Sequence, residues 1–541
     1  MLRRAWKPLA ASAAGVGTGA YVYTRYVATR PSPLETFDLT IRENSNMVTR
    51  TIPLIPKENI DQRINEFATQ ESRATAEGLL WKHTTAKLAS NDPIEDANAQ
   101  TIIDKEASAL SPAGQLLFFS VMDGHGGKDT SRLLSKVLIP AVALELATLV
   151  QDTAPNKSSW LDSLKSLLGS SSSPKIEPRI PLDADPSAVT EAIQRAFTNL
   201  DSEIINAPLR LLAANMDKTA FEKKLIPDLS QHPMALPAML PAMSGSCALM
   251  ALLDTARQDL YVACTGDCRA VAGYWDESED GTGTWRVEVL SEDQTGRNPN
   301  ELKRMQSEHP PDEADDVIRR GRVLGGLEPS RAFGDARYKW SREAQYALDK
   351  AFLEGNGKTM RQPPSTFKTP PYVTALPVVT HRKLSLPSSS TSSTNSNSNS
   401  KSSLRFIVLA TDGLWDQLSS SQVVHLVAGH LSGLRGPIAH SALPSLVPLD
   451  TESGSRTIEG KDKGHRSGTA EKEGQWAFVD ENVSAHLIRN AFGGADVERL
   501  RKFLSIPPGI SRRYRDDVTV TVLWYEPLGE KTGGETVKTK L

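Results

Sequence analysis

Cysteine and net charge are both scarce in this sequence of 541 residues. Its three cysteines, Cys247, Cys264 and Cys268, are odd in number and match no zinc-binding spacing, which excludes a zinc finger and a complete disulfide framework. We expect buried, reduced thiols, which fit a reducing compartment. The formal net charge of -3 lacks the basic excess of a nucleic-acid-binding protein, so no nucleic-acid partner is expected.

Acidic residues are also missing at the N-terminus. The first is Glu35, and five positive residues precede it: Arg3, Arg4, Lys7, Arg25 and Arg30. A basic segment without acids is typical of mitochondrial presequences, so residues 1–30 are expected to direct the chain to the mitochondrial matrix. Long hydrophobic runs are lacking as well, because residues 9–23 are short for a membrane span, which needs about 20 apolar residues. A retained inner-membrane anchor and an unstructured N-terminus are the alternatives.

The composition, 39% hydrophobic and 23% charged residues, is that of an ordinary globular protein with a large buried core. We expect one large domain over residues 81–527, an N-terminal extension over 31–80 and a disordered tail over 528–541. Stretches rich in serine, proline or charge, or without a clean hydrophobic period, are interpreted as loop inserts on the surface. They cover residues 158–186, 209–243, 387–403 and 436–474.

Short apolar runs bounded by turn residues predict β-strands. Three of them cover residues 116–122 (LLFFSVM), 404–410 (LRFIVLA) and 518–525 (VTVTVLWY), and three others cover 247–253, 260–264 and 269–275. Apolar residues three and four positions apart predict a helix over 189–204. A second helix is expected to start at Asn298, with Pro299 in its first turn and Glu301 closing a capping box. Strands that outnumber helices and follow one another favour an α+β fold with antiparallel sheets.

Carboxylates stand at the ends of three of these strands. Asp123 and Gly124 follow the first run, Asp412 follows the second, and Asp516 precedes the third. A single Asp-Gly after a strand is usually a plain turn. Three strand tips that each carry an aspartate are suited to converge on a hard cation, because Mg²⁺ and Mn²⁺ prefer oxygen ligands. The acidic pair at positions 95–96 is a fourth candidate.

Seven motifs occur in order along the chain. They are 91–96 (NDPIED), 121–127 (VMDGHGG), 244–248 (SGSCA), 266–270 (GDCRA), 330–335 (SRAFGD), 410–416 (ATDGLWD) and 514–520 (YRDDVTV). Together they resemble the type-2C family of metal-dependent protein phosphatases, from about residue 87 to residue 525. The resemblance implies a four-layer αββα sandwich, in which two antiparallel β-sheets pack face to face and are flanked by helices, with several loop insertions.

The same resemblance implies the ligands of two Mg²⁺ or Mn²⁺ ions. Asp123 would bridge the ions, the Gly124 carbonyl would bind one, and Asp412 and Asp516 would hold the other. Three further acids would act through waters or at a weaker third site: Glu95, Asp96 and Asp267.

Protein serine/threonine phosphatase activity is the function that this family implies. Two cations about 3.5–4 Å apart lower the pKa of a shared water, which attacks phosphorus. His125, beside Asp123 on the glycine-rich loop, is the candidate general acid for the departing serine or threonine oxygen. The plainer interpretation of His125 is a solvated loop histidine.

Asn91 departs from the commonest pattern of the family, in which many members carry a phosphate-binding arginine at that position. The segments 88–96, 325–335, 480–490 and 504–508 look like the mitochondrial pyruvate dehydrogenase phosphatase branch. They imply that the substrate is the E1α subunit of the pyruvate dehydrogenase complex and place Asn91 near the substrate phosphate. Another mitochondrial phosphoprotein as substrate, and a non-catalytic pseudophosphatase that only binds partners, are the alternatives.

Overall fold

The computed structural model describes residues 35–43, 46–75, 78–108, 111–149, 183–216, 225–278, 282–386, 401–450 and 474–528. The predicted targeting segment at 1–30, most of the insert at 158–186, residues 387–400 and 451–473, and all but the first residue of the predicted tail lie outside this range. Within the described part, no helix combines the length and the hydropathy of a membrane span.

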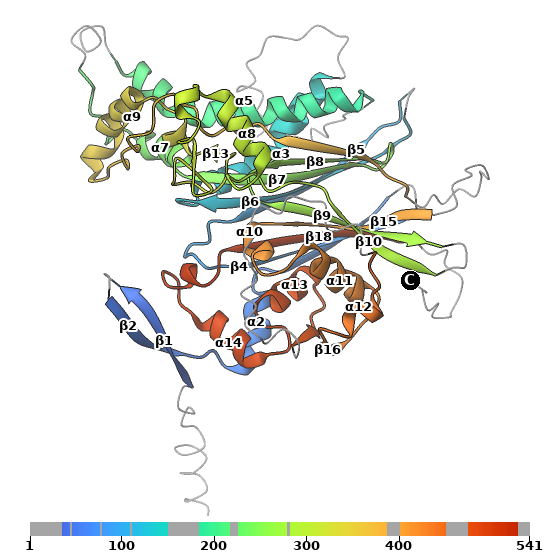
Figure 1. The fold of residues 1–541 in the computed structure, drawn as a ribbon. Helices are drawn as coiled ribbons and strands as arrows, with labels where there is room; N and C mark the ends of the chain where they lie inside the picture. Colours follow the sequence, from blue (N-terminus) through green and yellow to red (C-terminus); the bar gives the residue numbers. More distant parts are fainter. Residues whose placement is uncertain are drawn as a thin grey trace, which may run out of the picture.

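Two antiparallel sheets form the centre of the protein (Figure 1). The first sheet has the order β10 (Gly283–Val289), β9 (Arg269–Glu277), β15 (Lys401–Ala410), β18 (Val518–Pro527), β4 (Leu79–Leu88) and β3 (Thr69–Ala74). The second sheet has the order β14 (Val378–Lys383), β8 (Asp259–Thr265), β7 (Gly245–Asp254), β6 (Gly114–His125) and β5 (Ala97–Lys105), and the short β13 (Phe333–Gly334) also pairs with β7. The antiparallel sheets predicted from the strand patterns are therefore confirmed.

Helices cover the outer face of each sheet, which completes the four layers. The second sheet packs against α3 (Asp129–Thr148), α5 (Pro186–Ala214) and α7 (Ala235–Met243), and the first sheet packs against α2 (Ile60–Asn65), α11 (Ser420–Leu431), α13 (Val483–Phe492) and α14 (Val497–Ser505). The remaining named elements are short or peripheral: β1 (Thr36–Glu43), β2 (Asn46–Pro53), α8 (Pro299–Glu308), β11 (Ile318–Arg319), β12 (Arg322–Val323), α9 (Arg342–Leu348), α10 (Asp412–Trp415), β16 (Gly436–Ala439), α12 (Leu443–Leu446) and β17 (Gln475–Phe478), besides several single turns of other helix types.

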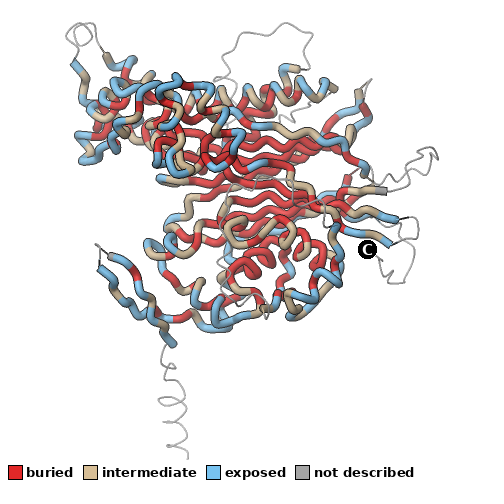
Figure 2. The backbone as a smooth tube through the Cα atoms, viewed as in Figure 1, coloured by how far each residue is buried: buried red, intermediate tan, exposed pale blue. Residues whose placement is uncertain are grey.

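The continuous apolar run of β6 is explained by its position between two packed layers. Leu117 and Phe119 point into the space between the sheets, whereas Leu116 and Phe118 pack against the helices on the other side. Successive side chains of a strand point to opposite faces. A strand that is buried on both faces is therefore apolar throughout and does not alternate between apolar and polar residues. Figure 2 shows the buried backbone as a continuous band through both sheets.

The helix predicted over 189–204 is confirmed as part of α5. Its periodic apolar residues are all buried against the second sheet: Val189, Ile193, Phe197, Leu200 and Ile204. The helix begins at Pro186, and the side chain of Asp185 accepts a hydrogen bond from the backbone N–H of Ser187. Aspartate before the helix and proline in its first turn are a favoured start, because the first N–H groups of a helix have no partner within it.

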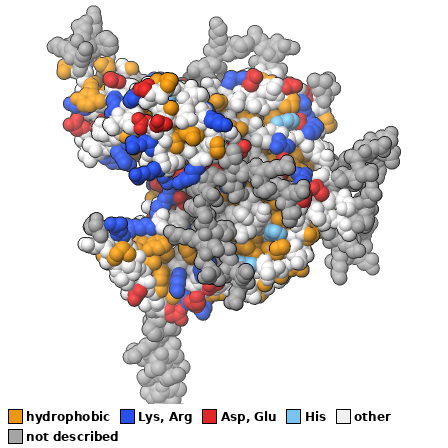
Figure 3. Space-filling view, in the orientation of Figure 1, with side chains coloured by type: hydrophobic (Ala, Val, Ile, Leu, Met, Phe, Trp, Pro, Cys, Tyr) orange, Lys and Arg blue, Asp and Glu red, His pale blue; other side chains and the backbone are white. Residues whose placement is uncertain are grey.

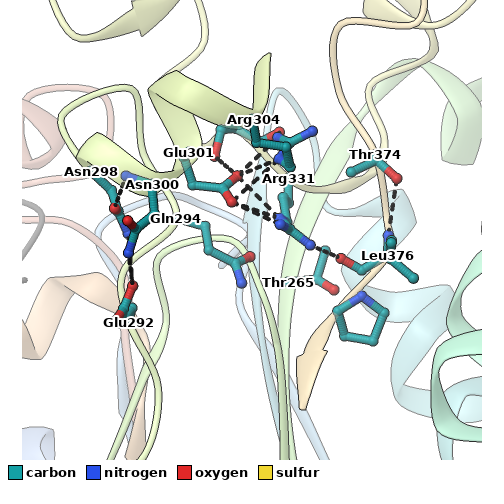
Figure 4. Close-up of polar contacts among 12 residues, drawn as sticks. Thr265, Glu292, Gln294, Asn298, Asn300, Glu301, Arg304, Arg331, Thr374 and Leu376 are labelled. Atoms are coloured by element: carbon teal, nitrogen blue, oxygen red, sulfur yellow. Dashed lines mark hydrogen bonds and ion pairs between the residues drawn. The ribbon is translucent and has the colours of Figure 1, made fainter. Parts of the chain in front are cut away.

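The start of α8 confirms one prediction and corrects another. Asn298 caps the helix, since its side chain accepts from the N–H of Asn300 at 2.9 Å, and Pro299 follows in the first turn. The predicted capping box is wrong, because the N–H of Asn298 donates to the Thr295 carbonyl at 3.0 Å. The carboxylate of Glu301 instead accepts hydrogen bonds from Arg331, Arg304 and Ser330 (Figure 4).

Residues 209–243, interpreted as a surface insert, hold the end of α5 and all of α7. Ala235, Met239 and Ala242 are buried in the same core as α3 and α5. This part of the segment is thus a layer of the core rather than a surface excursion. The predicted domain boundary at residue 81 falls within β4, and β3 adds a further strand before it.

Candidate metal centre and catalytic site

Three predicted ligands meet at one edge of the two sheets. Asp123 lies near the end of β6, Asp412 follows β15 as the first residue of α10, and Asp267 lies in the turn from β8 to β9. One carboxylate oxygen of each lies within 4.8 Å of the others. The expectation that the first strand ends at residue 122 is wrong, because β6 pairs with β7 as far as His125. Asp123 is therefore held in place by the pairing of β6 with β7 in the second sheet.

The fourth predicted ligand, Asp516, lines the same cavity just before β18. It accepts the N–H of Asp517 at 2.7 Å and forms an ion pair with Arg512. The cavity has a volume of about 480 Å³ and is lined by Asp123, His125, Asp267, Arg297, Arg322, Gly326, Leu327, Glu328, Pro329, Asp412, Asp416, Arg512 and Asp516. Such a set of carboxylate oxygens suits Mg²⁺ or Mn²⁺, which prefer oxygen ligands and keep several waters of their own.

The negative charges of the buried carboxylates Asp123 and Asp96 are poorly balanced by the rest of the protein. Burial, reinforced by the negative charges of Asp412 and Asp96, raises the pKa of Asp123 well above its ordinary value. Burial and the charge of Asp517 raise the pKa of Asp96 to about 8. Among the described residues, the buried Asp96 Oδ1 has no hydrogen-bond partner, while its Oδ2 accepts from Thr411 at 2.9 Å. Buried carboxylates are stable as anions only beside compensating positive charge, so this group fits divalent cations.

The backbone carbonyl of Glu95 packs against Gly124. A side chain at position 124 would overlap the Glu95 carbonyl and the Ser131 hydroxyl, so only glycine allows the loop to pack against β6. Burial raises the pKa of Glu95, and Asp517 adds to the effect. Glycine at 124 thereby lets the backbone of Glu95 pack against the strand that carries Asp123.

Asn91 is not brought to the cavity. Its side-chain amide donates to Asp517 Oδ2 at 2.9 Å, and its backbone N–H donates to Asp517 Oδ1 at 2.9 Å. The same carboxylate also accepts the N–H groups of Ser90 and Glu95. Asp517 therefore fixes the whole loop from Ser90 to Glu95, and Asn91 is part of that brace.

His125 contacts a carboxylate that sequence reasoning had not singled out. Its Nε2 lies 2.6 Å from Asp335 Oδ2. Burial alone would lower the pKa of His125, but the charge and the hydrogen bond of Asp335 raise it above its ordinary value. The imidazole is thus disposed to carry the proton that a general acid must donate.

The contact depends on Gly245, which lies between the two residues. In the strand register Gly245 pairs with His125 on one side and with Gly334 on the other. A side chain on Gly245 would overlap both His125 Nε2 and Asp335 Oδ2. Asp335 itself has a left-handed backbone with φ of 46°, a conformation that is rare outside glycine and is often kept for function.

Positive side chains flank the cavity above the carboxylates. Arg297 and Arg322 lie on one side and share the carboxylate of Glu328, at 2.9 and 2.5 Å. Lys and Arg side chains gather on both sides of the hollow at the left of Figure 3. A cation-binding floor below a positive rim is an arrangement that attracts phosphate groups.

Comparison with known proteins agrees with this geometry. The sequence profile of protein phosphatase 2C matches residues 91–439. The chain belongs to the protein phosphatase 2C family. It is a protein serine/threonine phosphatase, and the family is metal-dependent.

Relatives of this phosphatase cover most of its length. A protein phosphatase 2C homologue of Schizosaccharomyces pombe is 30% identical over 542 residues, which cover 98% of this chain and 97% of that protein. The mitochondrial pyruvate dehydrogenase (acetyl-transferring) phosphatase 1 of Saccharomyces cerevisiae is 31% identical, over 92% of this chain and 78% of that protein. The human protein of the same name is 32% identical, over 81% of this chain and 76% of that protein.

Proposed function

We propose that this phosphatase removes phosphate from serine on the E1α subunit of the pyruvate dehydrogenase complex in mitochondria and thereby reactivates the complex. The observation that carries the chemistry is the meeting of Asp123, Asp267 and Asp412 beside the His125–Asp335 pair. The names of the yeast and human relatives support the substrate and the mitochondrial location. Residues 1–30 would act as the targeting segment.

The carboxylates would hold two Mg²⁺ or Mn²⁺ ions. Asp123 would lie between them, with the Gly124 carbonyl, Asp412 and Asp516 as further ligands, and Glu95 and Asp96 would support the ions through waters. Asp267, which lies in the same cluster as Asp123 and Asp412, would serve a weaker third ion. When bound, such ions lower the pKa of a water and offset the charge of the phosphoryl oxygens.

His125 would act on the leaving group. As the P–O bond breaks, the serine oxygen gains negative charge, and a proton from Nε2 of the imidazolium would neutralise it. Asp335 accepts from that same nitrogen in the described structure, at 2.6 Å. The serine oxygen would therefore replace Asp335 as the acceptor, while the Asp335 charge keeps the imidazole protonated until transfer.

The direct test uses pyruvate dehydrogenase complex that its kinase has inactivated. Purified phosphatase with Mn²⁺ should restore dehydrogenase activity over time, and the Asp412→Asn variant, which lacks one ligand, should not. Release of phosphate from generic phosphoproteins without recovery of the dehydrogenase would contradict the substrate. That outcome would favour another phosphoprotein, as the S. pombe relative's general name also allows.

A further inference from the structure

The cavity needs a positive group for the substrate phosphate, and Asn91 does not supply it. A phosphoryl dianion is bound most strongly by charge-assisted hydrogen bonds from a planar guanidinium. Three arginines line the cavity: Arg297, Arg322 and Arg512. We propose that Arg512 binds the phosphoryl group of the substrate. This inference rests on the proposed function, since it assigns a residue to the same site.

The residues on either side of Arg512 are anchored to the neighbouring loop. Arg512 lies in the turn Ser511–Arg513, four positions before the predicted ligand Asp516. The hydroxyl of the buried Ser511 donates to the Ser90 carbonyl, and Arg515, also buried, donates to the Ala89 carbonyl. The backbone on both sides of Arg512 is thus attached to the loop that Asp517 fixes. This anchoring fixes the point from which the Arg512 side chain reaches the cavity.

The position of Arg512 suits a phosphate between the cations and the general acid. Its side chain is 41% exposed and lines the same cavity as Asp123, His125 and Asp412. A cation on Asp516 would repel the guanidinium that now pairs with it, and phosphate oxygens are the acceptors that could then take its donors.

The other two arginines are less suited to this role. Arg297 and Arg322 both donate to Glu328, so one carboxylate offsets part of their charge and holds them at the rim. Their side chains are 43% and 41% exposed, about as much as that of Arg512, so it is the shared pairing with Glu328 and not exposure that sets them apart. A place at the rim suits contact with protein segments beside the phosphoserine rather than with the phosphate.

Arg513 is a matched control for Arg512. It is the next residue of the same turn, is exposed, and donates to the Arg42 carbonyl on β1 at 2.7 Å. It does not line the cavity. The test therefore compares Arg512→Gln, Arg512→Lys and Arg513→Gln with the wild-type protein, all with saturating Mn²⁺.

The first measurement is the Kd of inorganic phosphate by calorimetry. Arg512→Gln should weaken phosphate binding roughly 10- to 100-fold, the cost of losing a charged hydrogen-bond partner. Arg512→Lys should fall between this variant and the wild type, because it keeps the charge and loses the two-pronged geometry. Arg513→Gln should stay within about two-fold, as expected for an exposed charge. If Arg512→Gln does not fold, as judged by circular dichroism, Arg512→Lys decides the question.

The second measurement is the Kd of Mn²⁺, which separates phosphate binding from support of Asp516. Unchanged phosphate affinity in Arg512→Gln at saturating Mn²⁺, with altered Mn²⁺ affinity alone, would overturn the proposal. Equal losses in Arg512→Gln and Arg513→Gln would overturn it too. Absence of wild-type activity on p-nitrophenyl phosphate would instead contradict the proposed function, whatever the arginine variants do.

Discussion

The imidazole of His125 and the carboxylate of Asp335 meet at 2.6 Å, although 210 positions separate them in the sequence. Gly245 makes the contact possible, because a side chain there would fill the space in which they meet. A carboxylate paired with a histidine holds the ring in place and stabilises its charged form. Asp335 is thus a positioning residue for the predicted general acid.

Replacing Asp335 should affect substrates according to their leaving group. Asp335→Asn keeps the shape and removes the charge, so His125 should be protonated less often. Hydrolysis of a phosphoserine peptide should slow by roughly 10- to 100-fold, a part of the 10²- to 10⁴-fold that proton donation contributes. Hydrolysis of p-nitrophenyl phosphate, whose leaving group needs little protonation, should slow much less. His125→Gln should show the same pattern, and equal losses on both substrates would contradict the acid role.

Metal removal and loss of a metal ligand should affect catalytic activity and thermal stability differently. Chelation should abolish turnover, and Mn²⁺ or Mg²⁺ should restore it. Asp412→Asn should weaken metal affinity by at least roughly 10- to 100-fold, the loss seen when a residue that supports a metal site is removed. In the metal-free protein, however, the same variant should raise Tm, because Asp412 adds to the repulsion on Asp123. Calorimetry with and without Mn²⁺ measures both effects. Asp315→Asn, at an exposed position outside the cavity, should change neither.

Acid should destabilise the protein through His486. Burial and the nearby His430 lower the pKa of this histidine to about 3. The unfolded chain, with a pKa near 6.5, binds a proton that the folded state excludes, so the contribution to stability is complete above about pH 6.5 and is lost as the pH falls toward 3. Between pH 6.5 and 5 the loss is about 2 kcal/mol, at about 1.36 kcal/mol per pH unit. His486→Phe, which suits the aromatic neighbour Phe478, should flatten this part of the profile of Tm against pH.

The carboxylate of Glu301 should be essential to the stability of residues 297–331, the segment that carries Arg297 and Arg322. Burial alone would raise its pKa, but Arg331 and Arg304 lower it to about 2. Glu301→Gln would leave the buried Arg331 without its anion, and breaking a buried pair costs about 3–5 kcal/mol. Thermal unfolding should report the loss. Glu308→Gln, which removes the more exposed partner of Arg304, should cost less than about 1 kcal/mol.

The proposed targeting role of residues 1–30 can be tested by deletion. Residues 1–30 precede every residue of the candidate site, so a chain without them should keep its phosphatase activity in vitro. In cells it should remain in the cytosol, as fractionation would show. Entry of the shortened chain into mitochondria would contradict the presequence.

Much of the fold could be predicted because its signals are local. Strands such as β6 and β15 contain continuous apolar runs, and the aspartates that follow these runs are visible as neighbours in the sequence. The helix α7 was missed because its sequence, ALPAMLPAM, has two prolines and no polar face. Pro237 lies in the first turn, where its missing N–H needs no partner, and the helix is short enough to tolerate Pro241 near its end.

The contacts that could not be predicted join residues that are far apart in the sequence. Asp335 reaches His125 only through the pairing of β13 with β7, and Asn91 is held by Asp517 across 426 positions. Glu301 was expected to bond within its own helix turn, yet its partner Arg331 lies 30 positions away. Local sequence patterns contain no information on which distant strand or loop will lie beside a given residue in the fold.

The central place of β18 in the first sheet, between β15 and β4, governs when the enzyme can first become active. Asp516 and Asp517 stand directly before this strand, and Asp517 holds the loop of Glu95 from the other end of the sequence. A nascent chain that stops short of residue 518 therefore lacks a middle strand and has no assembled cavity. Partial translation products and fragments cut before this point should be catalytically silent, so the phosphatase cannot act on phosphoproteins that it meets before its synthesis is nearly complete.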